Sequence, residues 1–91
     1  MMVRRQGEWL TAKVGDELVM MSTERANYIG LNEVGVRIWE LIERPQEIDT
    51  ICAQLLKEYD ISPEACQVEV DAFLSELVQH GAAALDPAPA A

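Results

Sequence analysis

The chain is poor in the side chains that most often perform chemistry. Its 91 residues include one histidine, His80, and two cysteines, Cys52 and Cys66. A zinc site needs several nitrogen, sulfur or carboxylate ligands that converge, and nucleophilic catalysis needs a serine or cysteine beside a base. The sequence shows neither pattern, and it contains no Gly-x-Gly-x-x-Gly or Walker A loop for phosphate. We therefore expect no enzyme activity, no metal site and no cofactor.

Long apolar runs are also missing. No stretch approaches the roughly 18 apolar residues of a membrane span, and the N-terminus, Met-Met-Val-Arg-Arg-Gln, lacks the pattern of a secretory signal. The sequence thus predicts a soluble, cytoplasmic protein that makes no membrane contact. Both cysteines fall on apolar stripes of predicted helices, which favours reduced thiols in the core over a disulfide or redox pair.

Positively charged residues are few, and they are lacking mainly in the C-terminal half of the chain. Sixteen acidic residues stand against seven Lys and Arg, for a formal charge of −9. Residues 1–39 are balanced, whereas beyond Trp39 eleven acids face only Arg44 and Lys57. This half should repel nucleic acid and favour a cationic partner, although such charge also serves simple solubility.

The first third of the chain predicts strands. Trp9–Val14 and Glu17–Ser22 are short apolar runs joined by Gly15 and Asp16, a pair suited to a tight reversal. A polar turn leads to a third run, Ala26–Leu31. We expect an antiparallel three-stranded meander with at least one unpaired edge.

Three helices are predicted after the strands. The first begins after Asn32, a suitable N-cap, and ends at Pro45, and the second covers residues 48–59. The third has clear limits, with Ser62 as N-cap and Gly81 as a left-handed stop. Its apolar stripe comprises Cys66, Val70, Phe73, Leu74, Leu77 and Val78.

The predicted fold is therefore α+β, a three-stranded antiparallel sheet followed by three helices, like a winged helix-turn-helix. Residues 1–85 form one domain, because a chain of this length has room for one core, and residues 86–91 form a flexible tail. His80 falls in the last turn of the third helix, where an imidazole interacts favourably with the helix C-terminus. A structural role for His80 is therefore expected.

Two surface features suggest binding. The free edge of the Ala26–Leu31 strand can accept an extended peptide as an added strand. On the third helix, Val68 and Ala72 extend the apolar stripe enough to wall a groove, or else pack within the domain or lie singly exposed. The residues by themselves leave these alternatives open.

Several segments together resemble the PqqD-like proteins. They are Gly15-Asp-Glu-Leu-Val-Met-Met-Ser22, Tyr28-Ile-Gly-Leu-Asn-Glu-Val-Gly35, Arg37-Ile-Trp-Glu-Leu41, Ser62-Pro-Glu64 and Leu77-Val-Gln-His-Gly81. The similarity covers residues 8–85 and is greatest to the discrete members of lasso-peptide clusters. The resemblance implies a recognition element that binds the leader of a ribosomally made precursor peptide for a separate cysteine-protease-like leader peptidase, with the cyclase as a further partner.

The resemblance also implies where the leader binds, namely along the third strand and against the third helix. The corresponding residues are Ala26, Asn27, Tyr28, Ile29, Gly30 and Leu31 of the strand and Val68, Ala72, Phe73 and Glu76 of the helix. Ile38 and Trp39 belong to the signature but are expected in the core. The family's aliphatic residue after the final glycine is replaced by Ala82-Ala-Ala84, so we expect this segment to pack loosely.

The alternatives are a winged-helix DNA-binding protein and a dimerisation module that uses the free strand edge. DNA binding depends on Lys and Arg contacts to phosphates. The predicted third helix has four acidic residues and no Lys or Arg. The sequence therefore favours a peptide over DNA.

Overall fold

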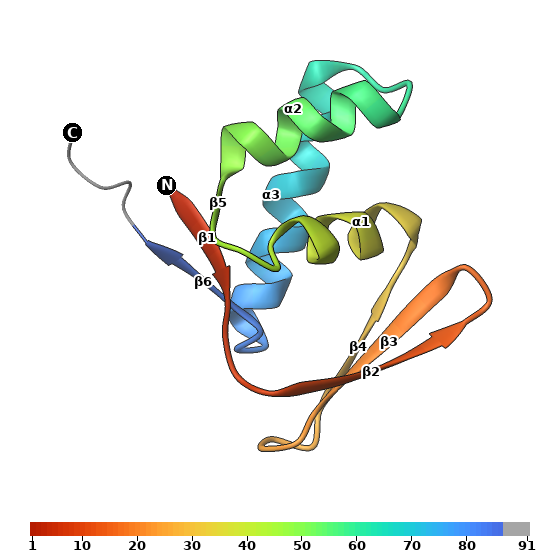
Figure 1. Cartoon of the computed structure of the whole chain (residues 1–91), viewed down its shortest axis with the longest axis vertical. Coiled ribbons are helices and arrows are strands. Elements are labelled where there is room, and N and C mark those ends of the chain that lie inside the picture. Colours follow the sequence, from red (N-terminus) through yellow and green to blue (C-terminus); the bar gives the residue numbers. More distant parts are fainter. Residues whose placement is uncertain (87–91) are drawn as a thin grey trace.

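The computed structural model describes residues 1–86 and shows two small antiparallel sheets and three helices (Figure 1). The α+β class is therefore confirmed. In chain order the elements are β1 (Met2–Arg5), β2 (Trp9–Val14), β3 (Glu17–Ser22), β4 (Tyr28–Leu31), α1 (Glu33–Leu41), β5 (Gln46–Glu47), α2 (Ile48–Glu58), α3 (Pro63–Gln79) and β6 (Ala83–Asp86).

The expected meander is the sheet β2-β3-β4. Gly15 makes the reversal between β2 and β3 with a φ of 65°, which glycine adopts without strain. Side chains alternate across β4, so that Ile29 and Leu31 are buried while Tyr28 is exposed. The helices cover one face of this sheet, and its other face is open (Figure 1).

The third strand begins later than the sequence predicted. Ala26 has a φ of 56°, a left-handed conformation that no strand residue adopts, and the strand starts at Tyr28. The turn before it is closed by Ser22, whose hydroxyl accepts hydrogen bonds from the N–H groups of Glu24 and Arg25. Local hydrogen bonding of this kind competes with strand extension.

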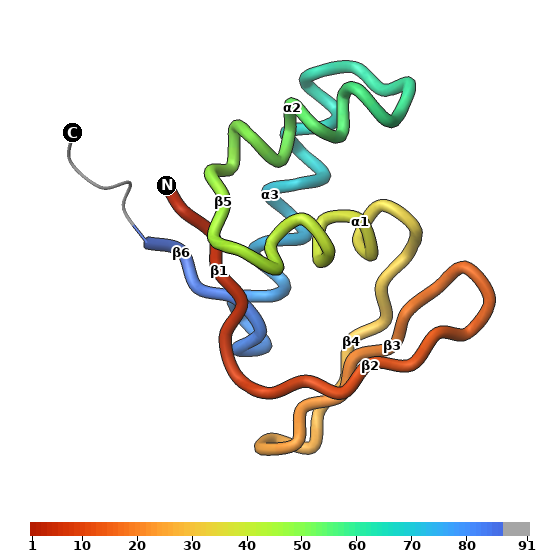
Figure 2. The backbone as a smooth tube through the Cα atoms, in the orientation of Figure 1, coloured from red at the N-terminus to blue at the C-terminus, as the bar shows by residue number. Residues whose placement is uncertain are grey.

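A second sheet was not predicted. β1 lies at its centre, with β5 on one side and β6 on the other (Figure 2). Its strands are short, and their partners are distant in sequence, with Met2 opposite Asp86. The expected loose packing after Gly81 was wrong, because β6 pairs with β1 and the Ala82 and Ala83 side chains are buried. Small side chains fit there because the sheet lies close against the core.

The described part of β6 includes Asp86, the first residue of the expected tail. Its carboxylate accepts a hydrogen bond of 2.7 Å from Arg4 Nε. The remaining residues of that expected tail, 87–91, lie outside the described residues. Across residues 1–86, none of the helices has the length and apolar character needed to cross a membrane.

The helices begin and end largely as the caps predicted. The Asn32 side chain accepts a hydrogen bond of 2.9 Å from Gly35 N–H, and the Ser62 hydroxyl accepts one from Ala65 N–H at 3.2 Å. Gly81 follows α3 with a φ of 75°. Helix α1 ends at Leu41, before Pro45. The core joins both sheets to all three helices and includes Met20, Ile29, Leu31, Ile38, Trp39, Ile51, Leu55, Val70, Leu74 and Leu77.

Arg5 fastens the small sheet to α1. Its guanidinium lies 4.1 Å from the centre of the Trp39 ring, at which distance cation and ring attract each other. Its Nε donates a hydrogen bond of 3.2 Å to the Trp39 carbonyl, to which Nη2 also donates. Helix α1 has no basic residue in its last turn. Arg5 therefore supplies the positive charge that its C-terminal carbonyls favour.

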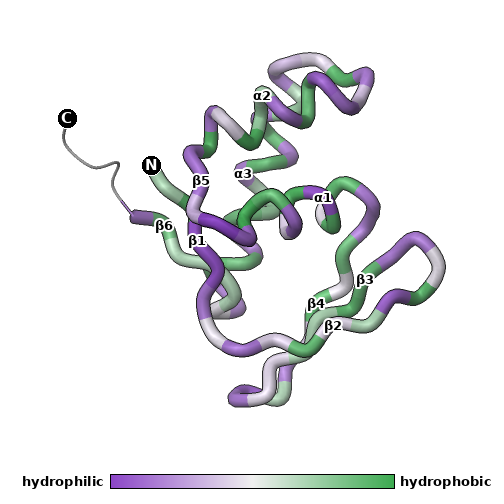
Figure 3. The backbone as a smooth tube through the Cα atoms, in the orientation of Figure 1, coloured by the Kyte–Doolittle hydropathy of each residue, from purple (hydrophilic) through white to green (hydrophobic). Residues whose placement is uncertain are grey.

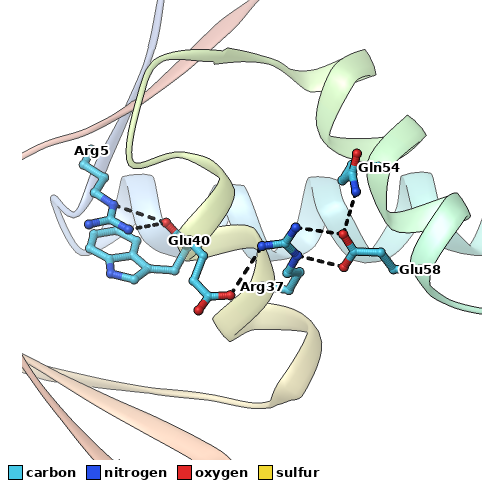
Figure 4. A network of polar contacts seen from close by, with 6 residues as sticks. Arg5, Arg37, Glu40, Gln54 and Glu58 are labelled. Carbon is cyan, nitrogen blue, oxygen red and sulfur yellow. Dashed lines mark hydrogen bonds and ion pairs between the residues drawn. The ribbon is translucent and has the colours of Figure 1, made fainter.

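A second polar contact joins α1 to α2 (Figure 4). Arg37 donates two hydrogen bonds to Glu58, of 2.7 and 2.8 Å, and Gln54 donates a third. These hydrogen bonds, first that from Arg37, lower the pKa of Glu58 from 4.5 to about 2, because they stabilise the charged form. The contact orients α2 against α1 on the side away from the sheet β2-β3-β4.

We predict that Arg5→Ala lowers the free energy of unfolding by about 2 kcal/mol, since it removes two charge-assisted hydrogen bonds and a cation–π contact. Urea denaturation followed by circular dichroism measures this difference. Arg4→Ala is the matched control, because Arg4 makes one exposed ion pair, worth at most about 1 kcal/mol. Equal losses in both variants would show that Arg5 does not fasten the sheet.

Candidate functional site

The described residues hold few groups suited to catalysis. Within residues 1–86 no three His, Cys, Asp or Glu side chains are grouped to hold a metal ion. Cys52 and Cys66 are both free, and Cys66 Sγ contacts the Cys52 carbonyl at 3.8 Å. Burial, and then the neighbouring Cys66, raises the pKa of Cys52 from 9.0 to about 11, since both disfavour the thiolate. A thiol with so high a pKa is a poor nucleophile at neutral pH.

The edge of β4 is the first feature suited to binding. Among the described strands, β4 pairs only with β3. Ser22 N–H donates to the Asn27 carbonyl at 2.8 Å, so Ser22 and Asn27 are a hydrogen-bonded pair between β3 and the chain entering β4. Since hydrogen-bonded positions alternate in an antiparallel pair, Ile29 and Leu31 also bond toward β3. The N–H and C=O groups of Tyr28 and Gly30 therefore point to the free edge.

The C-terminal half of α3 lies beside β4. At the start of the strand, Asn27 Nδ2 lies 3.3 Å from His80 Nδ1. Just beyond its end, α1 approaches α3 so closely that a Cβ on Gly35 would lie 3.1 Å from Phe73 Cε1. The start of the strand thus contacts the end of α3, and its other end leads into α1, which packs on the middle of α3.

A groove of about 270 Å³ opens where β4 ends, between the first turns of α1 and the middle of α3. Phe73 is half-buried in its wall and packs against the core. The lining residues are Asn32, Val34, Gly35, Ile38, Glu69, Ala72, Phe73 and Glu76. Its volume is near the lower end of pockets that bind small ligands, and suits one or two side chains.

The structure divides the predicted site residues into four groups. Ala72, Phe73 and Glu76 line the groove, and Tyr28 and Gly30 present backbone groups at the strand edge. The side chains of Ile29 and Leu31 are buried in the core, whereas those of Ala26, Asn27 and Val68 lie outside the groove lining. Burial removes the Ile29 and Leu31 side chains from any contact with a ligand.

Sequence reasoning missed the contribution of α1 and of Glu69. Asn32 was interpreted as a helix cap and Ile38 as a core residue, and Val34 and Gly35 were named as part of the family-like segment, yet each lines the groove. Glu69 precedes Phe73 by four residues and Glu76 by seven, so helical spacing alone places all three on one face. That spacing was the available signal for Glu69. No comparable signal in the sequence shows that α1 approaches α3.

The groove is lined by hydrogen-bond acceptors, among them two carboxylates, and by apolar side chains. Within residues 1–86 neither Glu69 nor Glu76 has an ion-pair partner, and α3 carries no Lys or Arg. Asn32 Oδ1 already accepts the cap hydrogen bond. The groove thus has an apolar surface formed by Ala72 and Phe73, here called the apolar seat, between the carboxylates of Glu69 and Glu76. It lies beside the open edge of β4.

A comparison with known protein families identifies the family of this chain. The family model described as coenzyme PQQ synthesis protein D (PqqD) matches residues 17–82, well over half of the chain. The chain belongs to the PqqD family. The match runs from β3 through Ala82 and so includes β4, whose edge is open, and α1 and α3, which line the groove of this PqqD-family chain. No curated protein sequence matched the chain.

Two solved structures share the fold of this PqqD-family chain over nearly its whole length. One is described as TbiB1 in complex with the TbiA(beta) leader peptide, with a TM-score of 0.79, 24% identity, and coverage of 92% of this chain and 98% of that one. The other is a lasso peptide synthetase B1 complexed with the leader peptide, with a TM-score of 0.77, 18% identity, and coverage of 91% and 98%.

We predict that Cys52 reacts slowly in the folded protein. A rise in pKa from 9.0 to about 11 lowers the thiolate fraction at pH 8 about 100-fold. The rate of iodoacetamide alkylation should therefore lie far below that of the urea-unfolded chain and should rise as the pH approaches 11. Alkylation of the folded protein at the rate of a free cysteine would contradict this and would reopen a redox role.

Proposed function

We propose that this chain binds the leader segment of a ribosomally synthesised precursor peptide, as occurs in the lasso peptide B1 structures that share its fold. The leader pairs as a strand with the free edge of β4 and places side chains in the groove against α3. The observation that carries the proposal is the open edge of β4 held beside that groove. The proposal is further supported by the two similar solved structures, which are both complexes with leader peptides.

Strand addition explains how such a site combines affinity with selectivity. The N–H and C=O groups of Tyr28 and Gly30 bind any extended backbone, whatever its side chains. Alternate side chains of an added strand, about 7 Å apart, point to the face on which Ile29 and Leu31 lie. Those side chains meet the groove, whose apolar seat on Ala72 and Phe73 selects among sequences.

Duplex DNA is disfavoured by the charge of the same surface. A DNA-binding helix neutralises phosphates with Lys and Arg, whereas α3 presents Glu69 and Glu76 to the groove. Dimerisation through β4 would use the edge that the leader needs, so a dimer would compete with leader binding.

The role that follows is delivery and not catalysis. A bound leader holds the attached core peptide near a processing enzyme and raises its effective concentration there. We propose that this enzyme is a separate cysteine-protease-like leader peptidase, with the cyclase as a second partner. Delivery requires a surface that stays free when the leader is bound.

The outer face of the sheet β2-β3-β4 is such a surface. Leu10, Met21 and Tyr28 are cross-strand neighbours in one row, with 64%, 50% and 70% of their surfaces exposed. Hydrophobic and hydrophilic residues alternate along β2 (Figure 3), and Leu10 is one of its exposed hydrophobic residues. Contiguous exposed apolar side chains mark protein interaction sites. We propose that the peptidase docks here.

We predict that Gly30→Pro abolishes strand addition. Proline removes the N–H that points to the free edge and puts its ring there, while a proline on the open side of an edge strand leaves the β3 ladder intact. The affinity for a synthetic leader from the neighbouring precursor gene should fall more than 10-fold in calorimetry. Circular dichroism and the melting temperature report whether the fold is kept.

Gly30→Ala is the matched control, because a Cβ at this position meets no atom within 4 Å and the N–H remains. It should bind the leader like the original chain. The proposed function fails if the unmodified chain gives no heat and no chemical-shift change with the leader. The strand-addition model alone fails if Gly30→Pro is folded and binds normally.

We predict that Met21→Glu slows leader removal by the peptidase without weakening leader binding, since it puts a charge in the exposed apolar row. The rate of leader cleavage in a mixture of this chain, precursor and peptidase measures the effect, and we expect a loss of about 10-fold, as for an interface hot spot. Leu56→Glu, at an exposed leucine of α2 away from the sheet, should leave the rate unchanged. Normal cleavage with Met21→Glu would exclude this docking face.

A further inference from the structure

One face of α3 alternates charge with apolar surface. Glu69, Ala72, Phe73 and Glu76 have the spacing i, i+3, i+4 and i+7, and all four line the groove. At about 1.5 Å per residue the two carboxylates lie about 10 Å apart along the helix axis, with the apolar pair about 5 Å from each. The groove thus has a negative group on either side of its apolar seat.

Within the described residues 1–86, these two carboxylates have no ion-pair partner to neutralise them. The four ion pairs of residues 1–86 use Glu40, Glu47, Glu58 and Asp86. Arg37, the basic residue of α1, is turned away to Glu58 (Figure 4). An ionised carboxylate only accepts hydrogen bonds. A ligand that lacked positive charge would therefore bring these groups out of water without compensation.

From this arrangement we infer the chemistry of the ligand. It is an extended peptide that carries a Lys or Arg side chain two positions from the apolar side chain seated on Ala72 and Phe73. This inference rests on the proposed function and deepens it, since it makes Glu69 and Glu76 determinants of which leader is accepted. Acidic leaders are rejected by the same two groups.

The spacing of an added strand fits this assignment. Side chains two residues apart on one face of a strand are separated by about 7 Å. When one apolar side chain occupies the seat, the next side chain on the same face lies within about 2 Å, along the helix axis, of the level of Glu69 or Glu76. The flexible stems of Lys and Arg cover this difference while their apolar methylenes lie on Ala72 and Phe73.

The test compares two double variants for binding of the synthetic leader from the neighbouring precursor gene. Glu69→Gln/Glu76→Gln removes the groove charges and keeps their shape. Glu64→Gln/Asp71→Asn, on other faces of α3, removes two charges from the same helix and serves as control. Affinity is measured by calorimetry at about 50 mM and about 500 mM NaCl, because this rise in salt shortens the range over which exposed charges interact from more than about 10 Å to a few ångströms.

We expect the groove variant to bind about 10-fold more weakly than the original chain at low salt and to lose most of its salt dependence. The control should follow the original chain at both salt concentrations. A leader in which the Lys or Arg beside its seated apolar residue is replaced by norleucine should lose affinity for the original chain and none for the groove variant. The melting temperature of each variant reports folding.

The possible failures are distinct. No binding of the leader to the original chain contradicts the proposed function. Binding that is equal in the original chain and the groove variant leaves leader recognition in place and overturns the inference about charge. Equal weakening by both double variants shows a general effect of net charge, and also overturns the role of Glu69 and Glu76.

Discussion

The close approach of α1 and α3 at Gly35 is the constraint on which the rest of the site depends. A side chain on Gly35 would meet Phe73 at 3.1 Å, so the absence of one lets the first turn of α1 lie against α3. Asn32 caps that turn and follows directly on β4, so the position of α1 also fixes where the strand ends. The position of the groove and the position of the strand edge thus both depend on the packing of α1 against α3.

The two halves of the site do different physical work. In the proposed mode of leader binding, backbone pairing at β4 supplies attraction that is nearly independent of sequence, and the groove supplies discrimination. The large pKa shifts of Glu58 and Cys52 arise at α2, where Arg37 and Cys66 pack, and neither residue lines the groove.

Local signals in the sequence predicted most elements, and long-range contacts account for what it missed. Asn32, Ser62 and Gly81 act within a few residues, so helix limits could be read from them. The alternation of Ile29 and Leu31 placed these side chains on one face, although only the structure shows that this face is the core. The strand β1 pairs with residues of β6, at the other end of the chain, and has no local signature of its own.

The candidate site was predictable to a similar degree. The family resemblance placed Ala72, Phe73 and Glu76 opposite the third strand, and the structure places all three in the lining of the groove. The sequence did not show that residues 32–38 form the other wall, because a glycine in a helix has no pattern that reveals which helix it approaches. Arg5 likewise contacts Trp39 across 34 positions, a distance beyond any local pattern.

The pairing of β1 with β6 has a consequence for folding. Val3 cannot meet Leu85 until nearly the whole chain has been synthesised, and closing so long a loop is slow relative to forming a hairpin or helix. The meander β2-β3-β4 can form early, which leaves its open edge without α3 beside it for as long as the C-terminal third is absent. A nascent or truncated chain would then show a bare strand edge, available to any extended segment, and would acquire selectivity only when α3 and β6 complete the fold.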